Sequence, residues 1–115
     1  MPDERTILPN SNRRAPRKKV DIEGWYNYSD TWYPCKIYDL SVSGAGLKIN
    51  QFFIAGDVIR LKFGVREDFR IVEAIVVNAN GTRIGVRFDV DPAMKDFIED
   101  VMASYHKAPP IRRPK

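Results

Sequence analysis

Two short segments of the chain carry residues whose types and spacing suit the binding of a small anion. The first, Arg13-Arg14-Ala15-Pro16-Arg17, holds three arginines in five residues and contains the pattern Arg-x-x-x-Arg. The second covers residues 39–44 and reads Asp-x-Ser-x-x-Gly. An arginine presents a rigid planar fork of donors that fits phosphate oxygens and the O6/N7 edge of guanine. Lysines at the same positions would supply charge without that planar geometry.

The second segment can supply hydrogen-bonding groups of the opposite kind. The Asp39 carboxylate can accept the N1 and N2 hydrogens of guanine, which no other common base presents together. The Ser41 hydroxyl and the backbone N–H groups of a tight turn can hold phosphate, and Gly44 permits the positive φ that closes such a turn. In isolation the pattern is more typical of a plain polar turn, in which Asp39 and Ser41 bond to their own backbone.

The arginine run is predicted to be an extended arm and not a helix. A spacing of four would align its first and last arginines on one helix face, but Pro16 pushes the residue before it out of the α region. We therefore place a flexible arm at residues 13–19, directly before the first strand. Arginine runs are also common on solvated surfaces. The register of the binding arginines stays open, because Arg14 and Lys18 also stand four apart.

The middle of the chain shows the residue pattern of short β-strands. Six segments alternate apolar with polar residues or are rich in aromatic and β-branched residues. These segments are residues 20–28, 32–40, 45–49, 57–63, 69–77 and 83–88. Pro34 in the second predicts a sheet edge or a bulge, because proline cannot donate to a strand ladder. The fifth is apolar on both parities in places and is predicted to be covered on both faces. Asn80-Gly81 after it is a hairpin turn signal.

A change of period marks a helix after the last strand. Apolar residues recur at spacings that describe one face of a helix. They are Met94, Phe97, Ile98, Val101, Met102 and Tyr105. Asp91 is a suitable N-cap, and Pro92 suits the first helical turn. Six short strands followed by one amphipathic helix predict an all-β fold, a barrel with a C-terminal helix packed against it.

The two motifs, in this order and around one predicted strand pair, resemble the PilZ family of bacterial domains. The family fold is a six-stranded antiparallel β-barrel with a C-terminal α-helix, and its members bind the second messenger cyclic di-GMP. The resemblance covers residues 13 to about 105. It rests on Arg13, Arg17, Asp39, Ser41, Gly44, Gly46-Leu47 and the late-strand run Ile84-Gly85-Val86-Arg87-Phe88.

The resemblance implies a cyclic di-GMP-binding receptor or adaptor with no catalytic activity and no cofactor. The arginines of the first motif are expected to clamp phosphates and guanine. The residues of the second motif are expected to form the wall of the binding site on the barrel. The expected ligand-binding residues are Arg13, Arg14, Arg17, Asp39, Ser41 and Gly44. The ligand is expected to order the arm on the barrel and thereby to signal to an unidentified protein effector. Some family members bind a stacked ligand dimer, so the stoichiometry stays open.

The 115 residues predict one domain, and a content of 43% hydrophobic and 30% charged residues is typical of a globular protein.

The charge of the chain is divided between basic ends and an acidic body. Residues 1–19 and 106–115 each carry a net +4, while residues 20–105 hold nine basic and thirteen acidic groups. The expected parts are a disordered lead-in at 1–12, the domain at 13–107 and a disordered basic tail at 108–115.

Neither a membrane span nor a metal site is expected from the sequence. The longest run without a charged residue is 74–82, nine residues, which is far short of the roughly 20 that a helix needs to cross a bilayer. The first residues are charged and no apolar run follows, so no signal peptide and a cytoplasmic location are expected. Cys35 is the single cysteine and is predicted to be a small buried apolar group.

Three other functions fit parts of the sequence. A triad of Ser41, Asp39 and His106 is disfavoured, because no nucleophile elbow, paired metal ligands or Walker-type loop accompanies it. A small nucleic-acid-binding barrel could use five aromatic residues, but most of these are expected in the core and the body is acidic. A PilZ-like adaptor that acts without ligand usually lacks the motif residues present here. The aromatic residues are Trp25, Tyr26, Tyr28, Trp32 and Tyr33.

Overall fold

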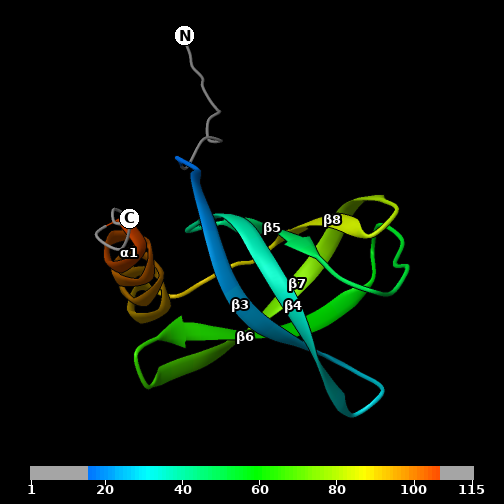
Figure 1. Cartoon of the computed structure of the whole chain (residues 1–115), viewed down its shortest axis with the longest axis horizontal. Coiled ribbons are helices and arrows are strands. Elements are labelled where there is room, and N and C mark those ends of the chain that lie inside the picture. Colours follow the sequence, from blue (N-terminus) through cyan, green and yellow to red (C-terminus); the bar gives the residue numbers. More distant parts are fainter. Residues whose placement is uncertain (1–15, 107–115) are drawn as a thin grey trace, which may run out of the picture.

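A closed antiparallel barrel followed by one helix makes up the described part of the protein. The structure, a computed structural model, describes residues 16–106. Six strands form the barrel in the order β3-β4-β5-β8-β7-β6, and α1 lies beside it (Figure 1). The elements are β3 (Lys18–Tyr28), β4 (Thr31–Ser41), β5 (Gly44–Lys48), β6 (Val58–Val65), β7 (Asp68–Asn80), β8 (Arg83–Arg87) and α1 (Pro92–His106). The predicted fold class is confirmed.

Tight turns with left-handed residues close two of the hairpins. Ser29 and Asp30 join β3 to β4 with φ angles of 53° and 65°. A type I′ turn requires this pair of positive φ values, and its twist matches that of the strands. Gly81, with a φ of 65°, follows β7 and leads into β8. The hairpin predicted at Asn80-Gly81 is therefore confirmed.

Helix α1 begins with the predicted cap and covers one side of the barrel. The Asp91 carboxylate accepts a hydrogen bond from the Met94 N–H at 2.8 Å, which satisfies a donor of the first turn that has no partner within the helix. The helix contacts β3, β4 and β6, and the centroid of its Phe97 ring lies 6.0 Å from that of Phe63 in β6. Within residues 16–106, no helix is long and apolar enough to cross a membrane.

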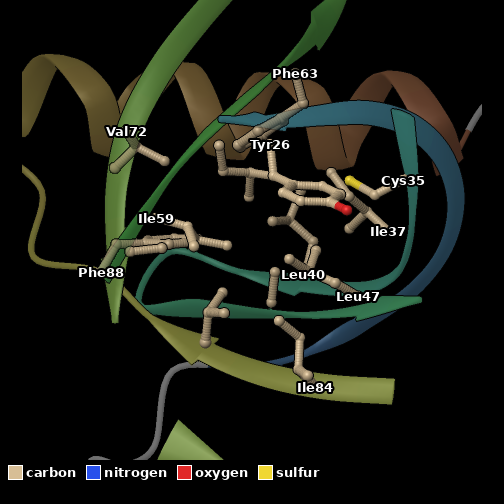
Figure 2. Packing of buried hydrophobic residues seen from close by; sticks show 14 of the residues in the cluster. Tyr26, Cys35, Ile37, Leu40, Leu47, Ile59, Phe63, Val72, Ile84 and Phe88 are labelled. Carbon is tan, nitrogen blue, oxygen red and sulfur yellow. The ribbon is translucent and has the colours of Figure 1, made fainter. Parts of the chain in front are cut away.

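The barrel interior is filled by apolar side chains from all six strands. In Figure 2 the side chains of Ile37, Leu40 and Leu47 lie together in this core, with Ile59 of β6 on the opposite side. Ile84 of β8 lies beside Leu47, with which it pairs. All five are at most 2% exposed. Burying a side chain of this size stabilises the fold by about 1.5–3 kcal/mol. Because a slip of one residue would turn such side chains outward, their burial fixes the strand register.

The outer face of β7 is exposed, so the prediction that residues 69–77 are covered on both faces is wrong. Four apolar side chains on this face are 37–47% exposed. They are Phe69, Ile71, Ile75 and Val77. The alternate residues Val72, Ala74 and Val76 are buried. The reason for the difference is the position of α1, which packs on β3, β4 and β6 and leaves the outside of β7 uncovered within the described residues.

The aromatic residues of β3 and β4 also lie nearer the surface than predicted. Of the five, only Tyr26 is buried. The β3–β4 hairpin extends past β5, because β5 pairs with β4 no further than Lys36. Rings near its tip pack on one another instead, and those of Tyr26 and Tyr33 stack with centroids 5.5 Å apart. Pro34 lies in this part of β4, where β3 is its only neighbouring strand within the described residues, so the predicted sheet edge is confirmed.

Cys35 is buried as predicted, and burial raises the pKa of its thiol to about 12. Because the thiolate is the reactive form, we expect the folded protein at pH about 8 to react with dithionitrobenzoate far more slowly than a free thiol does. Absorbance of the released thionitrobenzoate gives the rate. Unfolding the protein in guanidinium chloride should restore fast reaction, and equal rates in the two states would contradict the burial.

Candidate functional site

The pairing of β3 with β4 brings the two sequence motifs together. Lys19 of β3 pairs with Asp39 of β4, so Arg17, two residues earlier, lies beside that aspartate. Arg17 Nη1 donates a hydrogen bond to Asp39 Oδ1 at 3.1 Å, and the two side chains form an ion pair. They are 52% and 25% exposed. A pair so exposed contributes at most about 1 kcal/mol to stability, and both groups can be reached by a ligand.

The remaining residues of the predicted arm fall on both sides of the start of the described chain. Arg13 and Arg14 lie outside the described residues. The predicted arm extends to residue 19, but Lys18 and Lys19 already belong to β3, where they pair with Leu40 and Asp39. Two lysines give no apolar signal for a strand, yet their backbone groups still complete the ladder with β4. Within the described chain, the arm is therefore limited to Pro16 and Arg17.

An irregularity in β4 turns the Asp39 side chain away from the barrel interior. β5 has no residue opposite Tyr38, so Tyr38 is the extra residue of a β-bulge. With regular alternation, Asp39 would point inward on the same face as Ile37. With the bulge, Ile37 and Leu40 are both fully buried and the Asp39 side chain is 25% exposed.

Gly46 makes room for the bulged Tyr38. A Cβ atom at Gly46 would lie 2.7 Å from the Tyr38 ring, which is closer than such contacts occur. The Arg83 guanidinium lies over the same ring, 4.8 Å from its centroid. The ring thus packs on a glycine backbone and beneath an arginine, and this packing holds the bulge next to Asp39.

The turn after Asp39 is held by the Ser41 hydroxyl. β4 ends at Ser41 and β5 begins at Gly44, so the loop predicted over residues 39–44 is only a two-residue turn. Ser41 is 2% exposed. Its Oγ accepts a hydrogen bond from the Ser43 N–H at 3.2 Å and donates to the Gly44 carbonyl oxygen at 3.4 Å. The backbone bond proposed for Ser41 in a plain turn is therefore present, and Ser43 is the exposed hydroxyl of the turn.

Gly44 is needed for a close approach of two strands and not for its backbone angle. The prediction of a positive φ is wrong, since among the described glycines only Gly56 and Gly81 have one. Gly44 pairs with Arg87 of β8, and a Cβ atom there would lie 2.5 Å from the Val86 carbonyl oxygen. A side chain at this position would push β5 and β8 apart.

An open cleft of about 380 Å³ lies beside the turn. Three of the predicted site residues line the cleft, together with four residues that the motifs do not specify. Asp39 does not line the cleft and is linked to it only through its hydrogen bond with Arg17. The lining of the cleft is Arg17, Ser41, Ser43, Gly44, Val77, Val86 and Arg87. Ser43 lies within the second motif, at one of the positions where the motif specifies no residue type, so the sequence could have indicated it. Val77 and Arg87 are brought to the site by strand pairing, which local sequence does not encode.

A second cleft of similar volume, about 360 Å³, lies along β4. Its lining includes Lys36 and Lys48 with Glu23. The Lys36 ammonium is already bound to the Asp21 carboxylate at 2.9 Å. Volume does not distinguish the two clefts, but chemistry does, because only the first combines two arginines with an exposed hydroxyl.

The arrangement around Arg17 offers donors, positive charge and an apolar wall in a volume typical of ligand pockets, which span roughly 300–1,000 Å³. The Ser41 hydroxyl, considered above for a triad, is engaged within its own turn. Among residues 16–106, no group of three or more His, Cys, Asp or Glu side chains is placed to hold a metal ion. The chemistry that these described residues favour is the binding of an anion that also carries a flat base.

The steric role of Gly44 can be tested by adding one methyl group. Gly44→Ala should destabilise the protein by about 1–3 kcal/mol, because the new methyl meets a backbone carbonyl that cannot move alone. Gly85→Ala is the matched control on the facing strand, where the added Cβ meets only the Asn78 side chain. Urea unfolding gives both values. Equal losses in the two variants would show that the contact with β8 is not what requires a glycine.

A model of the PilZ domain family matches residues 11–104 of the chain. The PilZ domain of YcgR from Escherichia coli with c-di-GMP has a TM-score of 0.71 and 16% identity, over 84% of this chain and 93% of that one. The PilZ domain of CeSA from a cellulose synthesizing bacterium has a TM-score of 0.65 and 15% identity, over 80% and 99%. Borreliella burgdorferi PlzA in complex with c-di-GMP has a TM-score of 0.57 and 19% identity, over 79% and 41%.

At these identities the solved structures show a common fold, and they agree with the barrel and helix described above. Among curated proteins, no sequence matches the chain. The family match, by contrast, extends over most of the chain, from before the arm to the last turns of α1. The chain belongs to the PilZ domain family.

Proposed function

We propose that the protein is a receptor for cyclic di-GMP. The observation that carries the proposal is the Arg17–Asp39 ion pair of 3.1 Å at the edge of the cleft. A guanidinium suits the O6/N7 edge of guanine, and a carboxylate suits the N1 and N2 hydrogens of the same base. The choice of ligand is supported by the family and by the c-di-GMP bound in the similar YcgR and PlzA structures.

In the proposed complex, Arg17 and Asp39 exchange their contact with each other for contacts with one guanine. The turn from Ser41 to Gly44 forms the floor, and the exposed Ser43 hydroxyl contacts a phosphate oxygen. Arg13 and Arg14 add positive charge from the arm and close over the ligand. Ordering of this arm on the barrel is the change that a protein effector recognises.

A hydrogen bond next to Arg17 offers a route from the arm to the helix. Lys18 follows Arg17 directly, and its ammonium donates a hydrogen bond to the Met102 carbonyl oxygen at 3.0 Å. Carbonyls near a helix C-terminus carry partial negative charge, so a lysine is favoured there. We propose that movement of Arg17 onto the ligand shifts Lys18 and, through it, the C-terminal part of α1.

Calorimetry with cyclic di-GMP tests the proposed receptor. Arg17→Ala and Asp39→Ala should each weaken binding by about 2–5 kcal/mol, because each removes a charged partner from a desolvated contact. Both variants should remain folded, since the ion pair itself contributes at most about 1 kcal/mol to stability. Lys36→Ala is the control, because it removes an ion pair of similar length at Asp21, away from the cleft.

Two outcomes would decide against this function. Absence of binding at about tens of micromolar ligand, a free energy weaker than roughly −6 to −7 kcal/mol, would favour an adaptor that acts without the ligand. Binding that survives both substitutions would place the ligand elsewhere on the protein. A loss of binding in Lys36→Ala equal to that in Arg17→Ala would contradict the assignment to this cleft, because it would show a general effect of surface charge or binding in the second cleft, which Lys36 lines.

The route to the helix predicts where the ligand changes the spectrum of the protein. Cyclic di-GMP should shift the NMR signals of backbone amides near Met102, which is remote in sequence from the cleft. Lys18→Met keeps most of the side-chain length but removes the donor, so it should abolish these shifts while leaving affinity within about threefold, less than 1 kcal/mol. Shifts near Met102 that persist in Lys18→Met would refute the coupling.

A further inference from the structure

The cleft has a second wall that neither motif describes. Arg17 lies on one side of the turn floor, and Arg87 and Val77 contribute to the lining from β8 and β7. Arg87 pairs with Gly44 on one neighbouring strand and with Ile75 on the other. Its backbone is therefore fixed from both sides, next to the glycine whose missing side chain lets the strands approach. An arginine so placed is an anchored donor group at the cleft.

Val77 lies on the outer face of β7, at a residue where this strand is irregular. Val76 pairs with Val86, and Asn78 pairs with Gly85, so β8 has no residue opposite Val77. A bulge of this kind re-aims a side chain, and bulges occur frequently beside functional sites. Val77 is 43% exposed, whereas the neighbouring lining residue Val86 is 2% exposed. Val77 thus supplies an accessible apolar surface beside the Arg87 guanidinium.

The charges of the described residues leave Arg87 available to an anion. Arg17 has Asp39 as its partner, and Arg70 has Asp68. Within residues 16–106, no carboxylate forms an ion pair with Arg87, which is exposed. Arg83, on the same strand and also exposed, lies over the Tyr38 ring and does not line the cleft. The two arginines of β8 therefore differ in what they face.

We infer that Arg87 binds a phosphate of the ligand and that Val77 packs against the flat face of a base. The inference rests on the proposed function. Cyclic di-GMP carries two guanines and two phosphates on one ring, so a ligand whose guanine is held by Arg17 and Asp39 extends its phosphates across the cleft. The guanidinium fork of Arg87 matches phosphate oxygens. Arg87 and Val77 would then set affinity and orientation together with the motif residues.

Calorimetry on the full chain with cyclic di-GMP, at low and at high salt, tests this wall. Arg87→Ala should weaken binding about 10- to 100-fold, as expected for a hydrogen bond to a charged group, and should make the affinity less dependent on salt. Arg87→Lys should recover part of the loss, because charge is restored without the fork. Val77→Ser should weaken binding about 3- to 10-fold through lost apolar contact. Arg60→Ala, the control, removes an exposed arginine of β6 that does not line the cleft, and it should bind like the wild type.

The outcomes separate this inference from the function on which it rests. If the wild type binds and Arg87→Ala binds equally well with the same salt dependence, the inference is wrong and the receptor proposal stands. If Arg60→Ala loses as much affinity as Arg87→Ala, the effect is long-range attraction and the assignment of a phosphate contact is wrong. If the wild type does not bind, the receptor proposal fails and the inference fails with it.

Discussion

One extra residue in β4 is the constraint on which the site depends. A regular strand would place the Asp39 carboxylate in the same apolar interior as Ile37, where an uncompensated charge costs several kcal/mol or more. The bulge at Tyr38 changes the phase of the strand, so that Leu40 takes the interior position and Asp39 turns toward Arg17. The same bulge thus keeps the core apolar and turns Asp39 toward the site. Residue 46 is a glycine because the bulged Tyr38 ring lies on it.

The order and type of the elements could be predicted because burial leaves a periodic trace in the sequence. Strands with one buried face alternate, the helix repeats its apolar residues at helical spacing, and Asp91 caps it as its position indicates. The prediction went wrong where burial depends on what lies outside the barrel. Apolar residues on both faces of β7 predicted a strand that is covered on both sides, but α1 packs on other strands. Sequence periodicity does not say which strands a helix will cover.

The motif residues of the candidate site could be predicted from the sequence, but the other residues that line the cleft could not. Arg17 and Asp39, 22 residues apart, are in contact, as the pairing of the two motifs implied. Gly44 was expected for the right position and the wrong reason, because the approach of β8 is a long-range feature. Arg87 and Val77 could not be assigned from local pattern, since one belongs to an ordinary alternating strand and the other to a bulge whose position depends on the partner strand. Strand register, and not residue type, places them at the cleft.

The contact between Arg17 and Asp39 has a consequence for selectivity under the proposed function. Each group already has a partner, so an incoming ligand must replace both halves of the bond that it separates. Inorganic phosphate can satisfy the arginine, but it leaves the aspartate facing another anion. Adenine presents a lone pair at N1, where guanine presents a hydrogen, and this lone pair would repel the carboxylate. Under the proposed function, the closed pair would therefore act as a competitor that guanine displaces without loss, and it would disfavour the binding of inorganic phosphate and of adenine nucleotides.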